Sequence, residues 1–218
     1  MHDTLKHLHR HRRGAGTIID HFLLNELGSQ LAFGGRRSHV YRRIVSPAGV
    51  RPGDSVLDVG CSSGYLTRKL AAATGPAGHV TGVDPSEAAL AYARRRARGA
   101  ATFTVGVAQG LPLPDSSFDV VTCTLAIHHV PARKRAAAFA EMYRVTRPGG
   151  RLLVADFDPS RHAFPRHPGA RRMHRAVATV GPLEDLAAVA GYRVESSSAG
   201  LPLLRYVLAV RPDPDATP

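Results

Sequence analysis

The segment from Ser55 to Thr67 limits the possible fold more than any other part of the chain. It reads Ser-Val-Leu-Asp-Val-Gly-Cys-Ser-Ser-Gly-Tyr-Leu-Thr. The first five residues form an apolar run typical of a strand buried on both faces, and the run ends at Gly60, where the chain must turn. A helix is expected to begin near Ser63. Because the glycines lack side chains and a new helix turn has free N–H groups, this corner suits a ligand that approaches the main chain.

A glycine turn of this kind is weak evidence by itself, because an ordinary tight strand-to-helix connection has the same pattern. The next predicted strand, His79 to Val83, helps to decide. It ends in Asp84, which lies 20 residues after Gly64, the interval at which a doubly wound domain places a carboxylate at the ribose of a nucleotide. Asp84 can also be a turn residue or a cap of the helix predicted over 86–98. Its spacing from the glycine turn favours ribose binding.

Strands and helices alternate through the middle of the chain. Strands are expected at 101–105, 119–123 and 151–157, and helices at 63–73, 86–98 and 132–145. This alternation predicts an α/β fold with a mostly parallel sheet covered by helices on both faces. The last third differs, because a helix at 182–190 precedes two strands, 192–197 and 204–210. The short link between these strands allows antiparallel pairing.

The flanking segments differ from this central domain, which spans residues 51–211. Residues 1–16 are rich in His and Arg and poor in apolar residues, so we expect a flexible basic tail rather than a metal site. Residues 17–50 carry apolar residues at helical spacing, and two interpretations are open: a lid, or helices that pad one face of the sheet. Residues 212–218 are expected to form a loose end.

The formal net charge of +12 raises the question of a polyanionic partner. Nearly all of the charge comes from Arg, and Ala, Gly, Pro and Arg are abundant together, which favours a bias of GC-rich coding over a functional basic surface. No run of about 20 apolar residues is present, and the N-terminus lacks an apolar signal segment. Cys61 and Cys123 end predicted buried strands, a poor arrangement for a secreted disulfide scaffold. We therefore expect a cytoplasmic protein with reduced cysteines.

Several motifs occur in a fixed order along the chain: Val-Leu-Asp-Val-Gly-x-x-x-Gly, Gly-Val-Asp-Pro-Ser, Leu-Pro-x-x-Asp-x-Ser-Phe-Asp-Val-Val, His-His-Val-Pro and Arg-Pro-Gly-Gly-Arg-Leu-Leu-Val-Ala-Asp-Phe. With this set, the chain from about Gly53 to Arg211 resembles the class I S-adenosylmethionine-dependent methyltransferases, in particular the type 11 group of small-molecule enzymes. The resemblance implies a Rossmann-like, seven-stranded sheet whose last strand lies antiparallel beside the fifth. It also implies S-adenosylmethionine as the cofactor and a small-molecule methyl acceptor. We predict no metal site.

The resemblance implies where this cofactor binds. The turn after the first strand would frame its methionine part, the carboxylate after the second strand would hold its ribose, and the segment after the third strand would flank its adenine. The implied residues are, in chain order, Asp58, Gly60, Cys61, Ser62, Gly64, Asp84, Pro85, Val107, Ala108, Gln109 and Thr124.

Two of these positions depart from the family pattern. Ser62 stands where the family usually has a glycine, a modest change because Ser fits a tight turn. Val107 stands where the family commonly has an Asp that accepts a hydrogen bond from the adenine amino group, and Val offers only apolar contact. The loss of one such bond, about 1 to 3 kcal/mol, weakens cofactor binding without abolishing it.

Methyl transfer asks little of the protein, because the sulfonium already makes the methyl group electrophilic. The enzyme must hold a nucleophile in line and remove its proton, and a positioned base adds about 100- to 10,000-fold. His128 follows the fourth strand, and Asp156 ends the fifth beside it. Some sugar and natural-product O-methyltransferases that look similar use a His and an Asp at these places. We therefore predict His128 as the base with Asp156 orienting it; alternatively, His129 caps a helix or fills the loop and Asp156 only ends a strand.

Acceptor choice is assigned to the N-terminal helices and to residues 160–181, which hold a cluster of basic side chains. This cluster either binds an anionic group of the acceptor or is a basic loop with no target. Trp is absent, no aromatic platform accompanies the cluster, and no Asn-Pro-Pro-Tyr signature is present, so nucleic acid is disfavoured as the substrate. An RNA-directed methyltransferase and a cofactor-binding protein without catalysis stay as alternatives, and a nicotinamide dehydrogenase is least favoured. The methylated atom and the oligomeric state are open.

Overall fold

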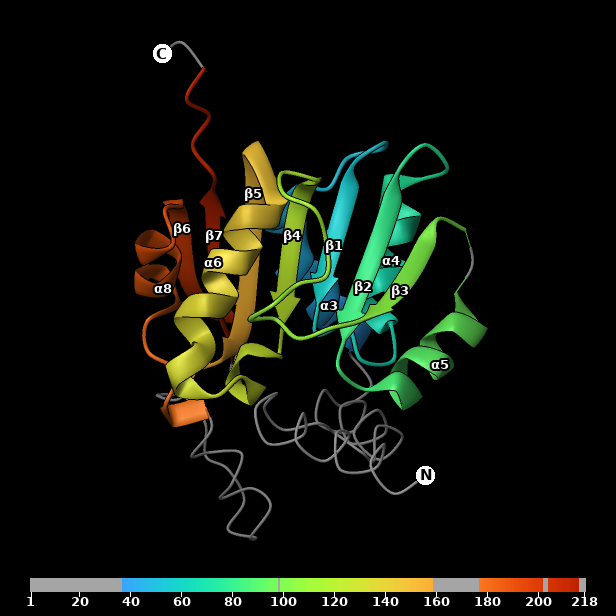
Figure 1. Ribbon diagram of the computed structural model, residues 1–218, viewed down its shortest axis with the longest axis horizontal. Coiled ribbons are helices and arrows are strands. Elements are labelled where there is room, and N and C mark those ends of the chain that lie inside the picture. The colour runs from blue at the N-terminus through green and yellow to red at the C-terminus, as the bar shows by residue number, and fades with distance from the viewer. Residues whose placement is uncertain (1–36, 98, 159–176, 202–203, 216–218) are drawn as a thin grey trace, which may run out of the picture.

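One seven-stranded sheet forms the centre of the computed structural model, which describes residues 37–97, 99–158, 177–201 and 204–215 (Figure 1). The strand order is β3-β2-β1-β4-β5-β7-β6. The first five strands are parallel, whereas β7 pairs antiparallel with both β5 and β6. The strands are β1 (Ser55–Val59), β2 (His79–Asp84), β3 (Ala101–Val105), β4 (Phe118–Thr124), β5 (Thr146–Phe157), β6 (Arg193–Leu201) and β7 (Leu204–Val210). The expected seven-stranded sheet, with its last strand antiparallel beside the fifth, is confirmed.

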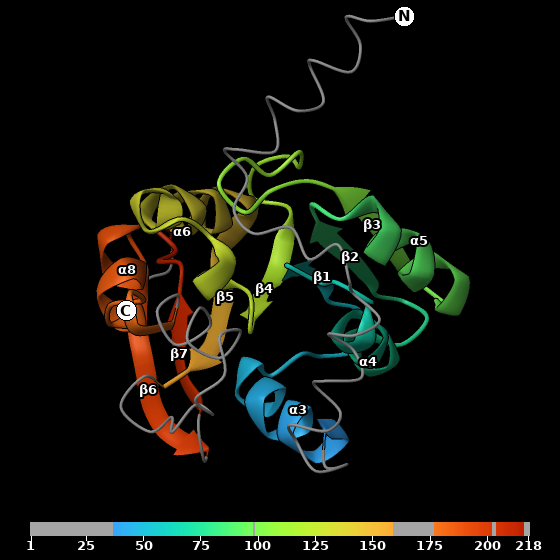
Figure 2. The same ribbon diagram turned by 90° about the horizontal axis from the view of Figure 1, so that it is seen from below.

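Helices cover both faces of the sheet, as Figure 2 shows from below. The helices are α3 (Arg37–Val45), α4 (Tyr65–Thr74), α5 (Glu87–Arg96), α6 (Arg135–Val145) and α8 (Leu183–Val189), with single 3₁₀ turns at Ser46–Ala48, Ile127–His129 and Ala132–Lys134. Alternate strand residues enter the two larger of three described cores, and the third lies between β3 and α5. Leu57 and its neighbours pack against α6 and α8 through Phe139 and Leu183. Val56 and its neighbours pack against α4 and against Tyr41 of α3.

Two element boundaries differ from those expected. The helix after β1 begins at Tyr65 rather than near Ser63, because Ser62 and Gly64 have φ values of 47° and 68°, outside the helical region. The fifth strand begins at Thr146 rather than Arg151. The reason is a bulge: Thr146 already pairs with Phe118 before the regular ladder resumes further along both strands.

The connection from β3 to β4 contains no helix. Residues 106–117 instead pack against α6, where the Glu141 carboxylate accepts a hydrogen bond from the Leu111 N–H at 2.7 Å. The Arg144 guanidinium donates to the carbonyl oxygens of Leu111 and Leu113 at 3.1 and 2.8 Å, and it also pairs with Glu141. The Leu111 and Leu113 side chains join the core below. This loop therefore takes the place of a helix, and α6 fixes its position.

Several expectations concern segments outside the described residues. These are the basic tail 1–16, the helical spacing over 17–36, the basic cluster within 161–175 and the last three residues. Of the N-terminal region, α3 is described, and its Tyr41 packs edge-on against Tyr65 with ring centroids 5.2 Å apart. Cys61 and Cys123 are buried and form no disulfide, as expected. Among the described helices, none combines the length and apolar character needed to cross a bilayer.

Candidate cofactor and acceptor site

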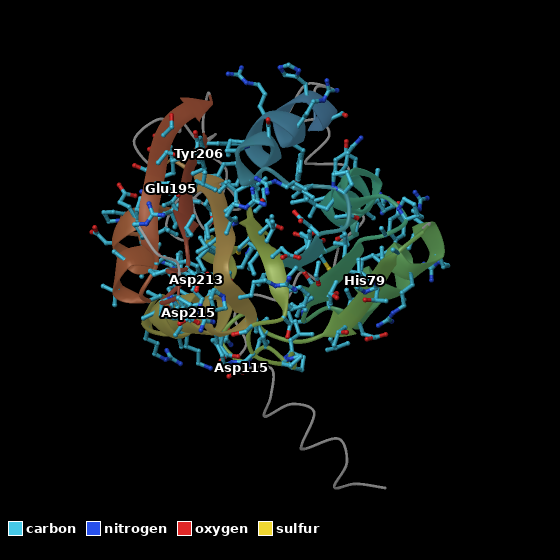
Figure 3. The ribbon with its side chains drawn as sticks, turned by 90° about the horizontal axis from the view of Figure 1, so that it is seen from above. His79, Asp115, Glu195, Tyr206, Asp213 and Asp215 are labelled. Carbon is cyan, nitrogen blue, oxygen red and sulfur yellow. The ribbon has the colours of Figure 1, made fainter. Side chains whose placement is uncertain are left out.

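The predicted site residues gather at one edge of the sheet. They follow the carboxyl ends of the parallel strands, which meet at the lower edge in Figure 1 and face the viewer in Figure 2. Open parallel sheets bind ligands at this edge. Figure 3 shows the opposite edge, where His79, Asp115 and Asp213 lie. None of the residues predicted for binding or catalysis belongs to that edge.

The glycine turn after β1 is tied to β2. The N–H groups of Gly60 and Cys61 donate to the Val83 carbonyl at 2.7 and 3.1 Å. A Cβ added at Gly60 would collide with the Ala126 side chain, and one added at Gly64 would lie 2.9 Å from Phe103. The sequence suggested that these glycines leave room for a ligand. The structure corrects this reason: protein atoms fill the space, and the glycines are required by positive φ and by packing.

Asp84 links the glycine turn to the end of β2. Its Oδ2 accepts a hydrogen bond from the Ser62 N–H at 2.9 Å, and its Oδ1 accepts one from the Ser86 N–H at 2.8 Å. Burial raises the pKa of this half-buried carboxyl, and the two N–H donors oppose that rise. A carboxylate offers about four lone-pair positions, so two acceptor positions are left for further donors. The Asp84 carboxylate thus holds the glycine turn through the Ser62 N–H and can still accept hydrogen bonds from both hydroxyls of a ribose.

Asp58 lies deeper, in the middle of the sheet. Its side chain is buried and accepts hydrogen bonds from the Thr67 and Thr122 hydroxyls at 2.7 and 3.3 Å. Burial raises its pKa from the ordinary 3.8 to about 6, although the two threonine bonds act against the rise. Sequence reasoning missed both threonines, since neither belongs to a motif. Asp58 therefore supports the turn from beneath and is not an exposed ligand.

His128 and Asp156 are in direct contact, as the sequence predicted. The His128 Nδ1 lies 2.7 Å from the Asp156 Oδ1, and the His128 N–H donates to the Oδ2 at 3.0 Å. The Phe157 N–H also donates to this carboxylate, at 2.7 Å. Both side chains are buried, and the His129 ring lies against the His128 ring with centroids 4.0 Å apart and the ring planes tilted by 43°. When the Nδ1 carries the proton donated to Asp156, the Nε2 is left with the lone pair of a base.

Four buried side-chain atoms in the described part of the chain have no hydrogen-bond partner: Gln109 Oε1, Thr124 Oγ1, His128 Nε2 and Arg205 Nε. All four belong to the carboxyl edge. Gln109 follows β3, Thr124 ends β4, His128 comes after it, and Arg205 is paired with Asp156 in the β5–β7 ladder. A buried polar atom without a partner costs about 1–3 kcal/mol, so such a concentration indicates a place for a polar ligand.

Arg205 is the site residue that sequence reasoning missed. The available signal was its charge within the otherwise apolar strand Leu204–Val210. Its guanidinium donates to the carbonyl oxygens of Val180 and Gly181 at 2.6 and 2.9 Å.

Two of the predicted site residues, Val107 and Cys61, offer little polar chemistry. Val107 forms a bridge with Gly110, and burial raises the pKa of the Cys61 thiol well above its usual range, so that this thiol stays protonated.

Comparison with known proteins agrees with this geometry. Residues 56–150 match the family model described as a methyltransferase domain. Residues 56–150 thus match a methyltransferase domain, and the seven-stranded sheet has the arrangement that the resemblance to class I S-adenosylmethionine-dependent methyltransferases implied. A solved structure described as an S-adenosylmethionine-dependent methyltransferase from Aquifex aeolicus matches 78% of the chain and 89% of its own length with a TM-score of 0.66, at 20% identity, and so shares the fold.

Two curated relatives resemble part of the methyltransferase domain. Demethylmenaquinone methyltransferase of Symbiobacterium thermophilum is 39% identical over 133 residues, which make up 59% of this chain and 52% of that protein. The ubiquinone/menaquinone biosynthesis C-methyltransferase UbiE of Burkholderia orbicola is 39% identical over 127 residues, or 55% of this chain and 51% of that protein. The chain thus spans about half the length of these relatives.

Within its described residues, no group of three or more His, Cys, Asp or Glu side chains is placed to hold a metal ion.

Proposed function

We propose that this protein transfers the methyl group of S-adenosylmethionine to a small molecule that carries a weakly acidic hydroxyl group. One observation supports the proposal above the others: the unpartnered buried atoms collect at the carboxyl edge of a methyltransferase domain. They include a base nitrogen on His128, donors on Thr124 and Arg205, and an acceptor on Gln109. The site thus offers donors and acceptors to both a cofactor and an acceptor molecule.

The cofactor fits residues at the ends of the first, second and fourth strands. Asp84 has acceptor capacity for the ribose hydroxyls, and the turn at 60–64 is fixed to it through the Ser62 N–H. Thr124 has a hydroxyl available for the polar groups of the methionine part. When bound, the cofactor supplies an electrophilic methyl group whose transfer releases S-adenosylhomocysteine.

His128 accepts the proton of the acceptor hydroxyl at its Nε2. Asp156 keeps the other ring nitrogen protonated and stabilises the imidazolium that forms, because its carboxylate accepts from both the ring and the backbone of His128. Both side chains are buried, so their interaction is weakly screened by water. Asp156 is held in place by the Phe157 N–H, which leaves the dyad little freedom to rotate.

The relatives support a hydroxylated ring as the acceptor, since one is named a demethylmenaquinone methyltransferase and the other a C-methyltransferase of ubiquinone/menaquinone biosynthesis. Removing the proton of a phenol or hydroquinone makes both the oxygen and the neighbouring ring carbon nucleophilic. The same base therefore serves O-methylation and C-methylation. The position of the acceptor ring relative to the cofactor then decides which atom receives the methyl group.

The test begins with calorimetry of the wild-type protein with S-adenosylhomocysteine. Turnover is then measured with a panel of hydroquinones, catechols, other phenols and sugars, and with RNA, by mass spectrometry of the products. We expect methylation of a hydroxylated ring and a 100- to 10,000-fold lower kcat in His128→Ala, at unchanged cofactor affinity. His129→Ala, the matched control next in the chain, retains activity.

Unchanged turnover in His128→Ala with intact cofactor binding would show that His128 is not the base. Methyl incorporation into RNA, with salt-dependent RNA binding, would replace the small-molecule acceptor. Cofactor binding without methylation of any panel member would contradict catalysis itself.

A further inference from the structure

The turn that follows β3 is attached to the strand that carries Asp84. Val105, the last residue of β3, pairs with Asp84 in the parallel ladder. The Gly106 N–H then donates to the main-chain carbonyl of Asp84 at 3.2 Å. A ribose bound to the Asp84 carboxylate therefore lies next to this turn, and the base attached to that ribose has this turn as its neighbour along the edge.

The turn has a fixed shape. Val107 and Gly110 form a bridge in which the Gly110 N–H donates to the Val107 carbonyl at 3.1 Å. The residue after it, Leu111, is held by the Glu141 carboxylate through its N–H and by the Arg144 guanidinium through its carbonyl. Gln109 thus belongs to a turn that is anchored at both ends. Its main chain is therefore held in place by the fold before any ligand arrives.

The Gln109 side-chain oxygen is buried without a hydrogen-bond partner in the described residues. Its neighbours in the turn cannot provide one, because the Val107 and Ala108 side chains are apolar, and Ala108 packs on the core. Water is excluded from the atom, so its acceptor capacity is unused in the protein alone. A ligand that brings a donor to this turn recovers the lost hydrogen bond.

Adenine has the complementary edge. Its exocyclic amino group is a donor, the neighbouring ring nitrogens are acceptors, and an amide side chain pairs with such an edge through its carbonyl and NH₂ groups. The Val107 side chain, in contrast, offers no hydrogen bond. We infer that Gln109 is the residue that reads the adenine amino group of the cofactor, a task that Val107 cannot perform. This inference rests on the proposed cofactor site and adds the residue that selects adenine over other bases.

The inference predicts a coupling between one side chain and one ligand group. Calorimetry compares S-adenosylhomocysteine with its analogue in which hydrogen replaces the 6-amino group. The wild-type protein is expected to bind the analogue about 5- to 100-fold more weakly, since the Gln109 oxygen stays unpaired. Gln109→Leu, of similar size, is expected to bind S-adenosylhomocysteine more weakly by a similar factor and to bind both ligands within about twofold of each other.

Two further variants make the test specific. Gln109→Glu keeps an acceptor at the same place and is expected to retain the preference for the amino group. Thr124→Val removes another unpartnered atom of the same edge. It is expected to weaken both ligands equally, so that the preference survives.

The outcomes separate this inference from the function on which it rests. A wild-type protein that binds neither ligand would overturn the cofactor site and, with it, the proposed function. A wild-type protein that binds both equally well would overturn only the role of Gln109. A Gln109→Leu protein that still prefers the amino group, while folded by circular dichroism, would do the same.

Discussion

Replacing Asp58 by Asn tests how the buried carboxyl couples stability to pH. Its pKa rises from 3.8 to about 6 because the side chain is fully buried. At about 1.36 kcal/mol per pKa unit, this rise corresponds to about 3 kcal/mol. The folded protein holds the proton more tightly than the unfolded chain, so between about pH 4 and pH 6 the folded state binds more protons. The free energy of unfolding contributed by this group therefore falls as the pH rises through that window.

Asn fits the same surroundings without a charge. Its carbonyl can accept from the Thr67 hydroxyl, and its NH₂ can donate to the Thr122 oxygen, which itself donates to the Leu57 carbonyl at 3.1 Å. Urea unfolding of both proteins at pH 4, 5, 6 and 7.5 gives the free energy of unfolding at each pH. Relative to the wild type, Asp58→Asn is expected to gain about 3 kcal/mol between pH 4 and pH 7.5.

Thr67→Val tests whether the Thr67 hydroxyl contributes to this pH dependence of stability. The Thr67 hydroxyl lowers the pKa of Asp58, so its removal is expected to raise that pKa further and to move the pH-dependent loss of stability to higher pH. Parallel stability curves for wild type and Asp58→Asn, within about 0.5 kcal/mol over the whole range, would refute the reasoning.

Gly60→Ala is expected to destabilise the protein by about 1–3 kcal/mol more than Gly75→Ala, because both glycines have positive φ but only Gly60 faces a protein side chain; equal melting temperatures would contradict this. Asp84→Asn is expected to weaken S-adenosylhomocysteine binding about 10- to 100-fold in calorimetry, since the hydroxyls lose a charged acceptor. Arg144→Gln removes the hydrogen bonds to the Leu111 and Leu113 carbonyls and is expected to weaken S-adenosylhomocysteine binding several-fold. The control Arg193→Gln, at an exposed position, is expected to leave the affinity unchanged. Equal affinities for the two variants would show that cofactor binding does not need Arg144 to hold the loop of residues 106–117.

The order of strands and helices was predictable because it depends on local patterns. Short apolar runs, glycine turns and helical spacing recur at intervals that fit a doubly wound sheet, and the spacing from Gly64 to Asp84 indicated a ribose carboxylate. The motif that contains His128 and the strand that ends in Asp156 were also visible. Their contact was only a hypothesis, because the residues are 28 positions apart and the sheet alone brings them together.

Other features depend on packing that no local pattern encodes. The sequence could not show that Ala126 and Phe103 fill the space beside Gly60 and Gly64. Nor could it show that Arg205, on a strand distant in sequence, lies opposite Asp156. The charge state of Asp58 likewise depends on burial and on two threonine hydroxyls from α4 and β4. Local periodicity is written in neighbouring residues, whereas burial, pairing across the sheet and unpartnered polar atoms arise only when distant segments meet.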